Sequence, residues 1–433
     1  TPSTGELYYQ GGWHTWLVGG LGPGGAALFA LDVTDPTTFS ESNAARMTIG
    51  EWTPANINCA NASGCGANLG QTYGTPLIRR LHNGKWAVLF GNGFGSSTGD
   101  AGIYIMTVDP ASGANTFYYL STGSSSANGI ASVASADLDG DHVTDYVYAG
   151  DLNGNLWRFD LTSNDPLQWS VTPGPLFTAP SGQPITTRPV VASIPAAGGA
   201  PRLMIAFGTG RKQPLTNTSP TSYAGGTQDL YGVWDWNLST WNSQSLVPYA
   251  SLPATAAGTG LAAPYTIGKS KLQAQVLTIN GVTTVREGTS NAVCWQGSSA
   301  CASGNSQFGW YADLPGGGEQ IIYNPILYQG AFIVNSIVPA SNSLISCAIA
   351  ADTGYTYAIT VGSGSTFAKA FPKYNDLLAA GVPENATGTP SIVTTAEGTA
   401  ALVYQTIGGK PAAQLINLPS NIKAKRLTWV ELR

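Results

Sequence analysis

The segment AGDLNGNLWRFDL (residues 149–161) contains a glycine turn, a short apolar strand, and an acidic residue that begins the next turn. The same pattern recurs in GGLGPGGAALFALDVTDP (19–36) and GNGFGSSTGDAGIYIMTVDPASG (91–113), with weaker echoes at 205–213, 229–236 and 350–360. Short apolar runs bounded by Gly, Pro, Asn and Asp are typical of β-strands joined by tight turns. Because one hairpin-bearing unit repeats along the chain, we predict an all-β fold of the β-propeller type.

Composition agrees with an exported all-β protein that has many turns. The chain has 433 residues, 54 of them glycine, and only 10% are charged. The net charge of −5 favours neither nucleic acid nor an anionic membrane surface as a partner. No apolar run approaches the roughly 20 residues of a membrane-spanning helix. The first residues, TPSTGELYYQ, lack the features of a signal peptide, so we expect a mature chain or part of a longer one. We treat residues 1–433 as one domain, in which only 373–381 has a helical pattern.

The segment DLDGDHVTD (137–145) holds four carboxylates in nine residues of a chain poor in charge. Alternate residues of a tight loop aim their oxygens at one point, and calcium takes about 6–8 oxygen ligands. The segment therefore predicts a calcium site whose ligands are the side chains of Asp137, Asp139, Asp141 and Asp145 and the backbone carbonyl of Val143.

This segment is not a regular EF-hand loop. The glycine, Gly140, comes two residues early, and Tyr148 stands at the twelfth position where a Glu is needed. The flanking sequences read as strands, so the loop is expected at the tip of a β-hairpin. The alternative interpretation is a solvated acidic hairpin tip without a metal.

The five cysteines suggest two local disulfides. Cys59 and Cys65, and likewise Cys294 and Cys301, close short loops of small residues. Zinc is the rival interpretation, but neither spacing is that of a zinc site, and the chain has only three histidines. Cys347 lies in an apolar, strand-like setting and is expected to be a buried free thiol.

Three further motifs are interpreted as structural. Gly20, Gly22 and Gly25 match a dinucleotide-binding pattern, but a strand-like run follows where a helix is needed. Ser97 sits in G-x-S-x-G, again before a strand rather than a helix. The tryptophans of WDWNLSTW (234–241) suit core packing better than a sugar or planar cofactor. We therefore predict no catalytic residues.

Several segments resemble the C-terminal domain of the PilY/PilC family of type IV pilus biogenesis factors and tip adhesins. They lie in family order along nearly the whole chain: 13–36, 73–96, 136–161, FGTGRK (207–212) and RLTWVELR (426–433). The resemblance implies a modified propeller, seven blades preferred, with a calcium loop inserted in one blade. It places the calcium ligands on the five residues named above, and it implies that RLTWVELR completes the first or last blade. It also implies a larger parent protein with an N-terminal part, often including a von Willebrand A-like region.

The functional expectations follow from this resemblance. A family member favours pilus extension over retraction and supports twitching motility and surface adhesion. Its partners are major and minor pilins, the N-terminal part of its own parent, and a host or abiotic surface. It is found at the cell surface or pilus tip, associated with the outer membrane or secreted. No Arg-Gly-Asp triplet occurs here, so integrin binding gets no support.

Two other classes of calcium-binding propeller are alternatives. In a quinoprotein (PQQ) dehydrogenase the calcium lies beside the cofactor on the propeller axis, whereas here one hairpin supplies the whole set of ligands. An integrin-like FG-GAP propeller repeats its calcium loops in several blades, whereas here one loop is present.

Overall fold

A computed structural model describes most of the chain: residues 2–124, 126–196, 198–213, 222–299, 301–302, 304–340, 350–394, 400–419 and 424–427. This part divides into two compact units, one ending at Leu176 and the other beginning at Phe177. The assignment of residues 1–433 to one domain stays a prediction. No helix within the described ranges is both long enough and apolar enough to cross a membrane.

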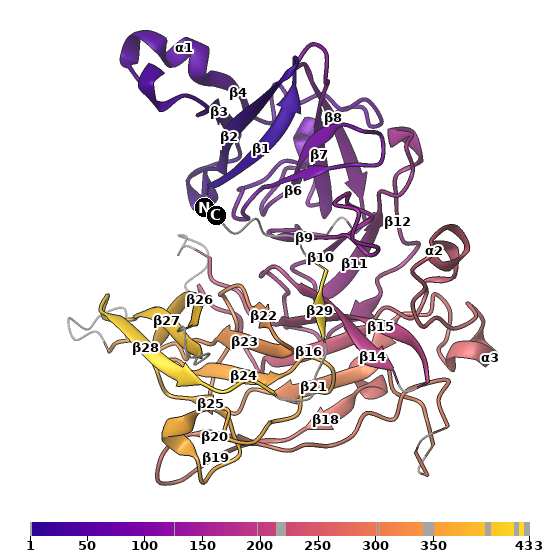
Figure 1. Cartoon of the computed structure of the whole chain (residues 1–433), viewed down its shortest axis with the longest axis vertical. Helices are drawn as coiled ribbons and strands as arrows, with labels where there is room; N and C mark the ends of the chain where they lie inside the picture. Colours follow the sequence, from indigo (N-terminus) through magenta and orange to yellow (C-terminus); the bar gives the residue numbers. More distant parts are fainter. Residues whose placement is uncertain are drawn as a thin grey trace. The chain divides into compact units, whose positions relative to one another are not determined.

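The first unit contains three antiparallel groups of four strands that follow one another along the chain, namely the sheets β1–β4 and β5–β8 and the strands β9–β12 of a six-stranded sheet (Figure 1). Each is an up-and-down meander, which is the form of a propeller blade. The strands are β1 (Ser3–Tyr9), β2 (Gly12–Gly20), β3 (Leu28–Asp32) and β4 (Thr48–Trp52); β5 (Leu77–Arg80), β6 (Trp86–Gly91), β7 (Gly102–Val108) and β8 (Asn115–Ser121); and β9 (Val133–Ala136), β10 (Tyr146–Gly150), β11 (Asn155–Asp160) and β12 (Ser170–Val171). The short helices are α1 (Ala44–Met47), η1 (Gly22–Gly24), η2 (Pro36–Thr38), η3 (Glu41–Asn43), η4 (Cys65–Asn68) and η5 (Pro166–Gln168).

The middle sheet of this unit, β5–β8, is buried on both faces. Val88 and Tyr104 belong to one core with Trp16 of β2. Ile103 belongs to a second core with Phe159 of β11. Because neighbouring residues of a strand point to opposite faces, a sheet between two cores needs apolar residues at every position. This explains why β7 is buried throughout and is apolar except at Thr107.

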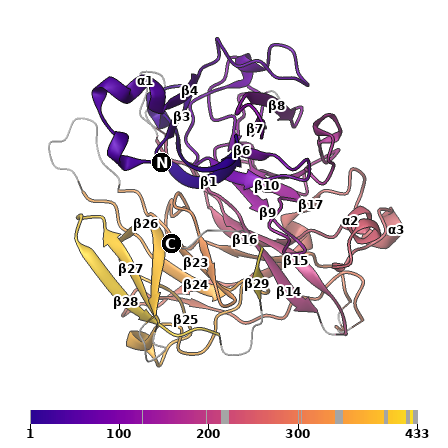
Figure 2. The same ribbon diagram turned by 45° about the horizontal axis from the view of Figure 1, so that its top comes forward.

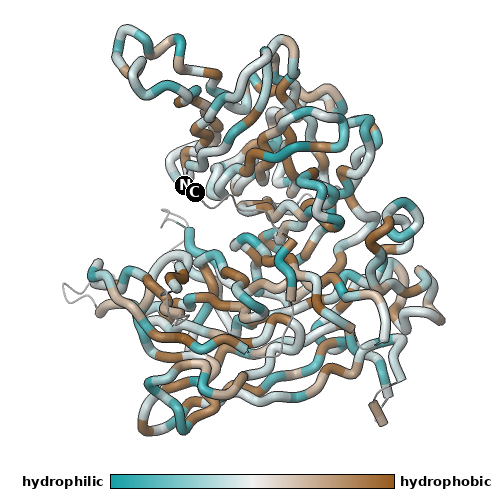
Figure 3. Tube along the Cα trace, in the orientation of Figure 1, coloured by the Kyte–Doolittle hydropathy of each residue, from teal (hydrophilic) through white to brown (hydrophobic). Residues whose placement is uncertain are grey.

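The second unit is also built from antiparallel meanders, with additional strands at their edges (Figure 2). Its main strands are β14 (Val190–Ala196), β15 (Gly199–Gly208), β16 (Asp229–Trp234) and β21 (Gly309–Asp313); β22 (Ile326–Tyr328), β23 (Ala331–Asn335), β24 (Thr356–Thr360) and β25 (Ala379–Val382); and β26 (Ala386–Thr394), β27 (Ala400–Thr406) and β28 (Pro411–Ile416). The remaining elements are β13 (Phe177–Thr178), β17 (Ile267–Gly268), β18 (Gln273–Gln275), β19 (Leu277–Ile279), β20 (Arg286–Gly288), β29 (Lys425–Arg426), α2 (Ser239–Gln244), α3 (Ala256–Thr259), η6 (Lys269–Lys271) and η7 (Pro372–Tyr374). Apolar residues recur along the strands of each unit (Figure 3).

The helix predicted over 373–381 is wrong. The segment holds the end of a 3-10 turn and then enters β25, which pairs with β20 and β24. All four residues of β25 are buried. Burial between paired strands outweighs the weak helical propensity of a short segment.

The disulfide predictions are confirmed. Cys59 is bonded to Cys65, with the Cα atoms 6.0 Å apart, and Cys294 is bonded to Cys301, with the Cα atoms 5.7 Å apart. Cys347 lies outside the described residues, so its free thiol stays a prediction. Of the terminal segment 426–433 only Arg426 and Leu427 are described, and β29 pairs with β14. Completion of the first or last blade by this segment therefore also stays a prediction.

The three motifs that were interpreted as structural lie next to strands or in the core. The run after Gly25 is strand β3, and the run after the Ser97 loop is strand β7. The Ser97 hydroxyl donates a hydrogen bond to the Ala67 carbonyl at 2.9 Å. Trp234, Trp236 and Trp241 are each less than 5% exposed, as core residues are.

Candidate metal centre

The acidic segment forms the connection between β9 and β10, at the tip of a hairpin as predicted. Its last residue closes the hairpin, because the Asp145 N–H donates to the Ala136 carbonyl at 2.9 Å. The loop is also fixed to the neighbouring sheet, since the Thr144 N–H donates to the Arg80 carbonyl at 2.9 Å. The loop is therefore held at both the strand end and the adjoining blade.

The Asp137 side chain organises the turn. Its two oxygens accept from the Gly140 N–H at 2.7 Å and the His142 N–H at 3.0 Å. Gly140 has φ 88° and His142 has φ 68°, both in the left-handed region. Glycine adopts this region freely, whereas a side chain such as that of His142 costs on the order of 1 kcal/mol there. Hydrogen bonds to Asp137 thus hold a backbone path that is unfavourable by itself.

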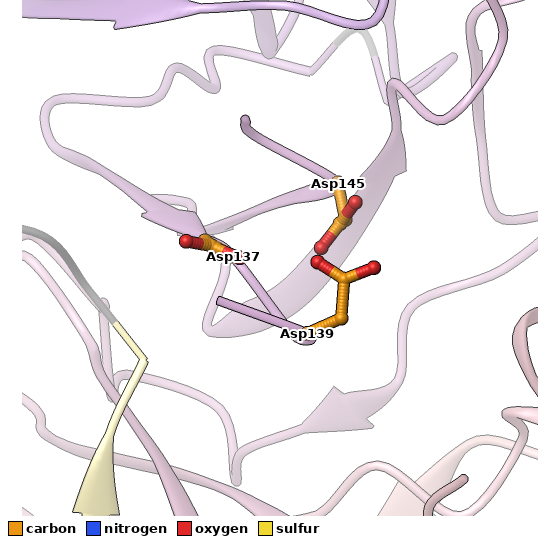
Figure 4. A group of neighbouring side chains, drawn as sticks. All are labelled: Asp137, Asp139 and Asp145. Atoms are coloured by element: carbon orange, nitrogen blue, oxygen red, sulfur yellow. The ribbon is translucent and has the colours of Figure 1, made fainter. Parts of the chain in front are cut away.

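Three of the four carboxylates converge. One oxygen from each of Asp137, Asp139 and Asp145 lies within 4.8 Å of the other two, and Figure 4 shows the carboxylates of Asp139 and Asp145 directed toward one another. Oxygens that ligate one calcium ion at about 2.3–2.6 Å are at most about 5 Å apart. The donor set is entirely oxygen, which suits a hard cation, so these residues fit calcium.

The structure does not bring Asp141 into this group. Its carboxylate accepts from the Val143 N–H at 2.8 Å and is directed along the loop instead. Asp141 is therefore outside the group of three convergent carboxylates. Ligation by the Asp141 side chain and by the Val143 carbonyl stays a prediction.

Sequence reasoning missed His82, which lies in the turn between β5 and β6. Its Nε2 is 2.8 Å from Asp145 Oδ1, while the other Asp145 oxygen accepts from the Leu138 N–H at 2.6 Å. Asp145 is fully buried, so this contact fixes the orientation of a carboxylate that water does not reach. The two residues are 63 positions apart and only the packing of neighbouring sheets brings them together. The single available signal was that His82 is one of only three histidines.

Burial dominates the electrostatics of this centre. It raises the pKa of Asp145 to about 6, and the hydrogen bonds from His82 and the Leu138 N–H offset part of that rise. The pKa of Asp139 is also raised, first by burial and then by the charge of Asp141. Contact with Asp145 raises the pKa of His82. Keeping these buried, neighbouring carboxylates ionised therefore costs electrostatic free energy. A bound cation offsets that free energy, because positive charge favours the ionised forms.

Calcium affinity is expected to fall as the pH drops through about 6. Calcium binds the ionised carboxylate, so a proton on Asp145 competes with the metal. Below the pKa of Asp145, calcium affinity falls by about tenfold per pH unit for each proton that calcium must displace. Protonation of His82 also weakens calcium binding. Calorimetric titrations from pH 7.5 to 5.0 test this, with His82→Gln as the variant that removes one titrating group. An affinity that is constant down to pH 5 contradicts the assignment of Asp145.

Comparison with known proteins identifies the family of the chain. A model of the PilY1 beta-propeller domain matches residues 4–245. The chain belongs to the PilY1 family. The type IV pilus biogenesis factor PilY1 homolog of Xylella fastidiosa (strain Temecula1) is 31% identical over 395 residues, which cover 83% of this chain and 22% of that protein. The type IV pilus biogenesis factor PilY1 of Pseudomonas aeruginosa (strain PAO1) is 29% identical over 373 residues, which cover 78% of this chain and 28% of that protein.

The fold of the family is known from a crystal structure of the Pseudomonas aeruginosa PilY1 C-terminal domain. That structure matches 96% of this chain and 83% of its own, with a TM-score of 0.68 and 27% identity. The predicted family resemblance and the β-propeller fold are both confirmed. The number of blades stays a prediction. The chain spans 22% to 28% of the length of the two PilY1 relatives named above.

Proposed function

We propose that this PilY1-family chain is the calcium-binding propeller of a type IV pilus biogenesis factor. In this role it supports pilus extension against retraction, twitching motility and surface adhesion. The observation that carries the proposal is the convergence of three carboxylate oxygens within 4.8 Å in a domain of this family. Its partners are major and minor pilins, the N-terminal part of its own parent, and a host or abiotic surface. It is located at the cell surface or pilus tip, associated with the outer membrane or secreted.

The proposed role does not involve catalysis. The Ser97 hydroxyl is engaged with a backbone carbonyl. The buried Asp229 carboxylate is engaged with Lys269, whose Nζ lies 2.7 Å from it and 2.5 Å from Asp313. Such an ion pair, with its charges compensated, is a structural arrangement rather than a nucleophile with its base. Calcium here acts on the shape and stability of the loop.

Opposite cellular phenotypes are expected from two substitutions of Asp145 in the full-length protein. Asp145→Ala removes a ligand, so this strain should show the phenotype of the calcium-free protein. Asp145→Lys supplies a tethered cation that neutralises the negative charge of the loop, so this strain should show the phenotype of the calcium-bound protein. Surface pili and twitching are measured in both strains, with Asp376→Ala and Asp376→Lys as controls, because Asp376 is an exposed carboxylate in the second unit.

Two outcomes contradict the proposal at different points. If both Asp145 variants bind calcium normally, the site is assigned to the wrong residues. If neither binds calcium but both strains assemble pili and twitch like the wild type, calcium only stabilises a hairpin, and the regulatory role fails.

A further inference from the structure

Five asparagine residues of the chain are followed directly by glycine. They are Asn83, Asn92, Asn128, Asn153 and Asn280. In such a pair the backbone nitrogen of the glycine can attack the side-chain amide carbon of the asparagine, because the glycine has no Cβ to hinder the close approach. The attack needs a glycine N–H that no other hydrogen bond holds and a turn with room to adjust. These two requirements separate one pair from the other four.

Four of the five pairs are held in place. In three of them the glycine N–H donates to a backbone carbonyl: Gly84 to Leu81 at 2.9 Å, Gly93 to Ile130 at 2.8 Å and Gly154 to Asp151 at 3.2 Å. In the fourth pair the Asn128 side chain is 1% exposed, and its amide donates to the buried Asp151 carboxylate at 2.9 Å. Each of these pairs must break a hydrogen bond before the attack can occur.

The fifth pair, Asn280 and Gly281, lies in the turn between β19 and β20 of the second unit. Gly281 is exposed, and its N–H has no acceptor among the described residues. Nothing lies within 4 Å of the place where a Cβ of Gly281 would stand. Two backbone hydrogen bonds of 2.9 Å close the turn, and both are made by Asn280, with Val285 and with Thr284. Gly281 is therefore the glycine whose nitrogen is available.

The Asn280 side chain is folded back along the turn. Its Oδ1 accepts from the N–H groups of Val282 and Thr283, both at 3.0 Å, so the side-chain amide lies beside the peptide that contains the attacking nitrogen. When that nitrogen adds to Cγ, negative charge develops on Oδ1. Two N–H donors that already point at this oxygen stabilise the charge. The hydrogen bonds that shape the turn thus also favour the addition.

We propose that Asn280 is a self-modification site, at which the amide is converted to aspartate or isoaspartate. The Gly281 nitrogen gives its proton to water and forms a bond to Cγ, and the Cγ–Nδ2 bond breaks with release of ammonia. The product of this step is a cyclic imide. Water then opens the imide at either carbonyl. One ammonia leaves and one water enters, so the mass rises by about 1 Da.

The conversion has a structural consequence at the same hairpin. The Asn280 amide donates to Glu287 Oε1 at 2.6 Å, whereas a carboxylate at position 280 sets two acceptors and two negative charges against each other. Glu287 belongs to β20, where it pairs with Thr278 of β19. Like charges across a strand pair are destabilising, and β19 is the edge strand of its sheet. The conversion therefore loosens the β19–β20 hairpin.

Timed incubation of the purified chain at pH 8 and 37 °C, followed by peptide mass spectrometry, tests the proposal. Asn280 should convert at least about fivefold faster than Asn153, which is the effect of one hydrogen bond of about 1 kcal/mol on a barrier. Asn153 is the matched internal control, because it is exposed as well but precedes a glycine whose N–H is bonded. Gly281→Ala should slow the conversion of Asn280, since the added methyl group hinders the attack. Equal rates at Asn280 and Asn153 overturn the proposal, as does a conversion of Asn280 that is faster in concentrated urea than in the folded chain.

Hydrogen exchange tests the consequence separately. Asn280→Asp imitates one product, and the amides of residues 277–288 should exchange faster in this variant than in the wild type. Adding Glu287→Gln removes the opposing charge and should return the exchange toward the wild-type rate. Exchange that is unchanged in Asn280→Asp, or equally fast in the double variant, overturns the claim that charge repulsion loosens the hairpin.

Discussion

Asp151→Ala is expected to lower the free energy of unfolding by roughly 3–5 kcal/mol. Asp151 follows β10 and is fully buried. One carboxylate oxygen accepts from the N–H groups of Asn153 and Asn155 at 3.0 and 2.8 Å. The other accepts from the side chains of Asn128, Asn155 and Trp157 at 2.9, 3.0 and 2.9 Å. Alanine leaves these donors buried without an acceptor, which costs more than the loss of an ordinary hydrogen bond.

Urea unfolding followed by tryptophan fluorescence measures this effect. Asp160→Ala is the matched control, because Asp160 belongs to the same sheet but, among the described residues, accepts only from the N–H and the hydroxyl of the nearby Thr162. The control should lose no more than about 1 kcal/mol. Equal losses in the two variants contradict the view that Asp151 is the central acceptor of this turn.

Asp145→Ala is expected to weaken calcium binding at least a hundredfold. Even at the dielectric constant of water, a divalent cation and a carboxylate about 2.4 Å apart attract by about 3.5 kcal/mol, which corresponds to several hundredfold in Kd. Asp145 is also fully buried, and its orientation is fixed on both oxygens, by His82 and by the Leu138 N–H.

Calorimetric titration compares this variant with two others. Asp376→Ala removes an exposed carboxylate elsewhere and should bind calcium like the wild type. His82→Gln keeps a hydrogen-bond donor near Asp145 and should retain most of the affinity. If Asp376→Ala loses as much affinity as Asp145→Ala, calcium is bound by general surface charge and not by the loop.

The strands and their turns were predictable because the signals are local. The run in β7 is buried at every position and apolar except at Thr107, and the structure explains this by cores on both faces of its sheet. The two disulfides were predictable because each closes a loop with a sequence separation of only 6 or 7 residues. Residues 373–381 were misassigned because a short segment takes its conformation from the strands beside it, which a local pattern does not contain.

The candidate site was predictable only in part, for the same reason. The spacing of DLDGDHVTD identified Asp137, Asp139 and Asp145, since alternate residues of a short loop can converge. It did not show that Asp141 turns toward the Val143 N–H, because that depends on the path of the backbone through Gly140 and His142. It did not identify His82, which arrives from a neighbouring sheet.

The most direct test of the account is the calcium stoichiometry of the wild-type chain. The protein is stripped with a chelator and titrated with calcium chloride in a calorimeter at pH 7.5, where the Asp145 carboxylate is ionised. The account predicts one calcium ion per chain, bound through the loop at residues 137–145. The absence of binding, or a stoichiometry of two or more, contradicts it.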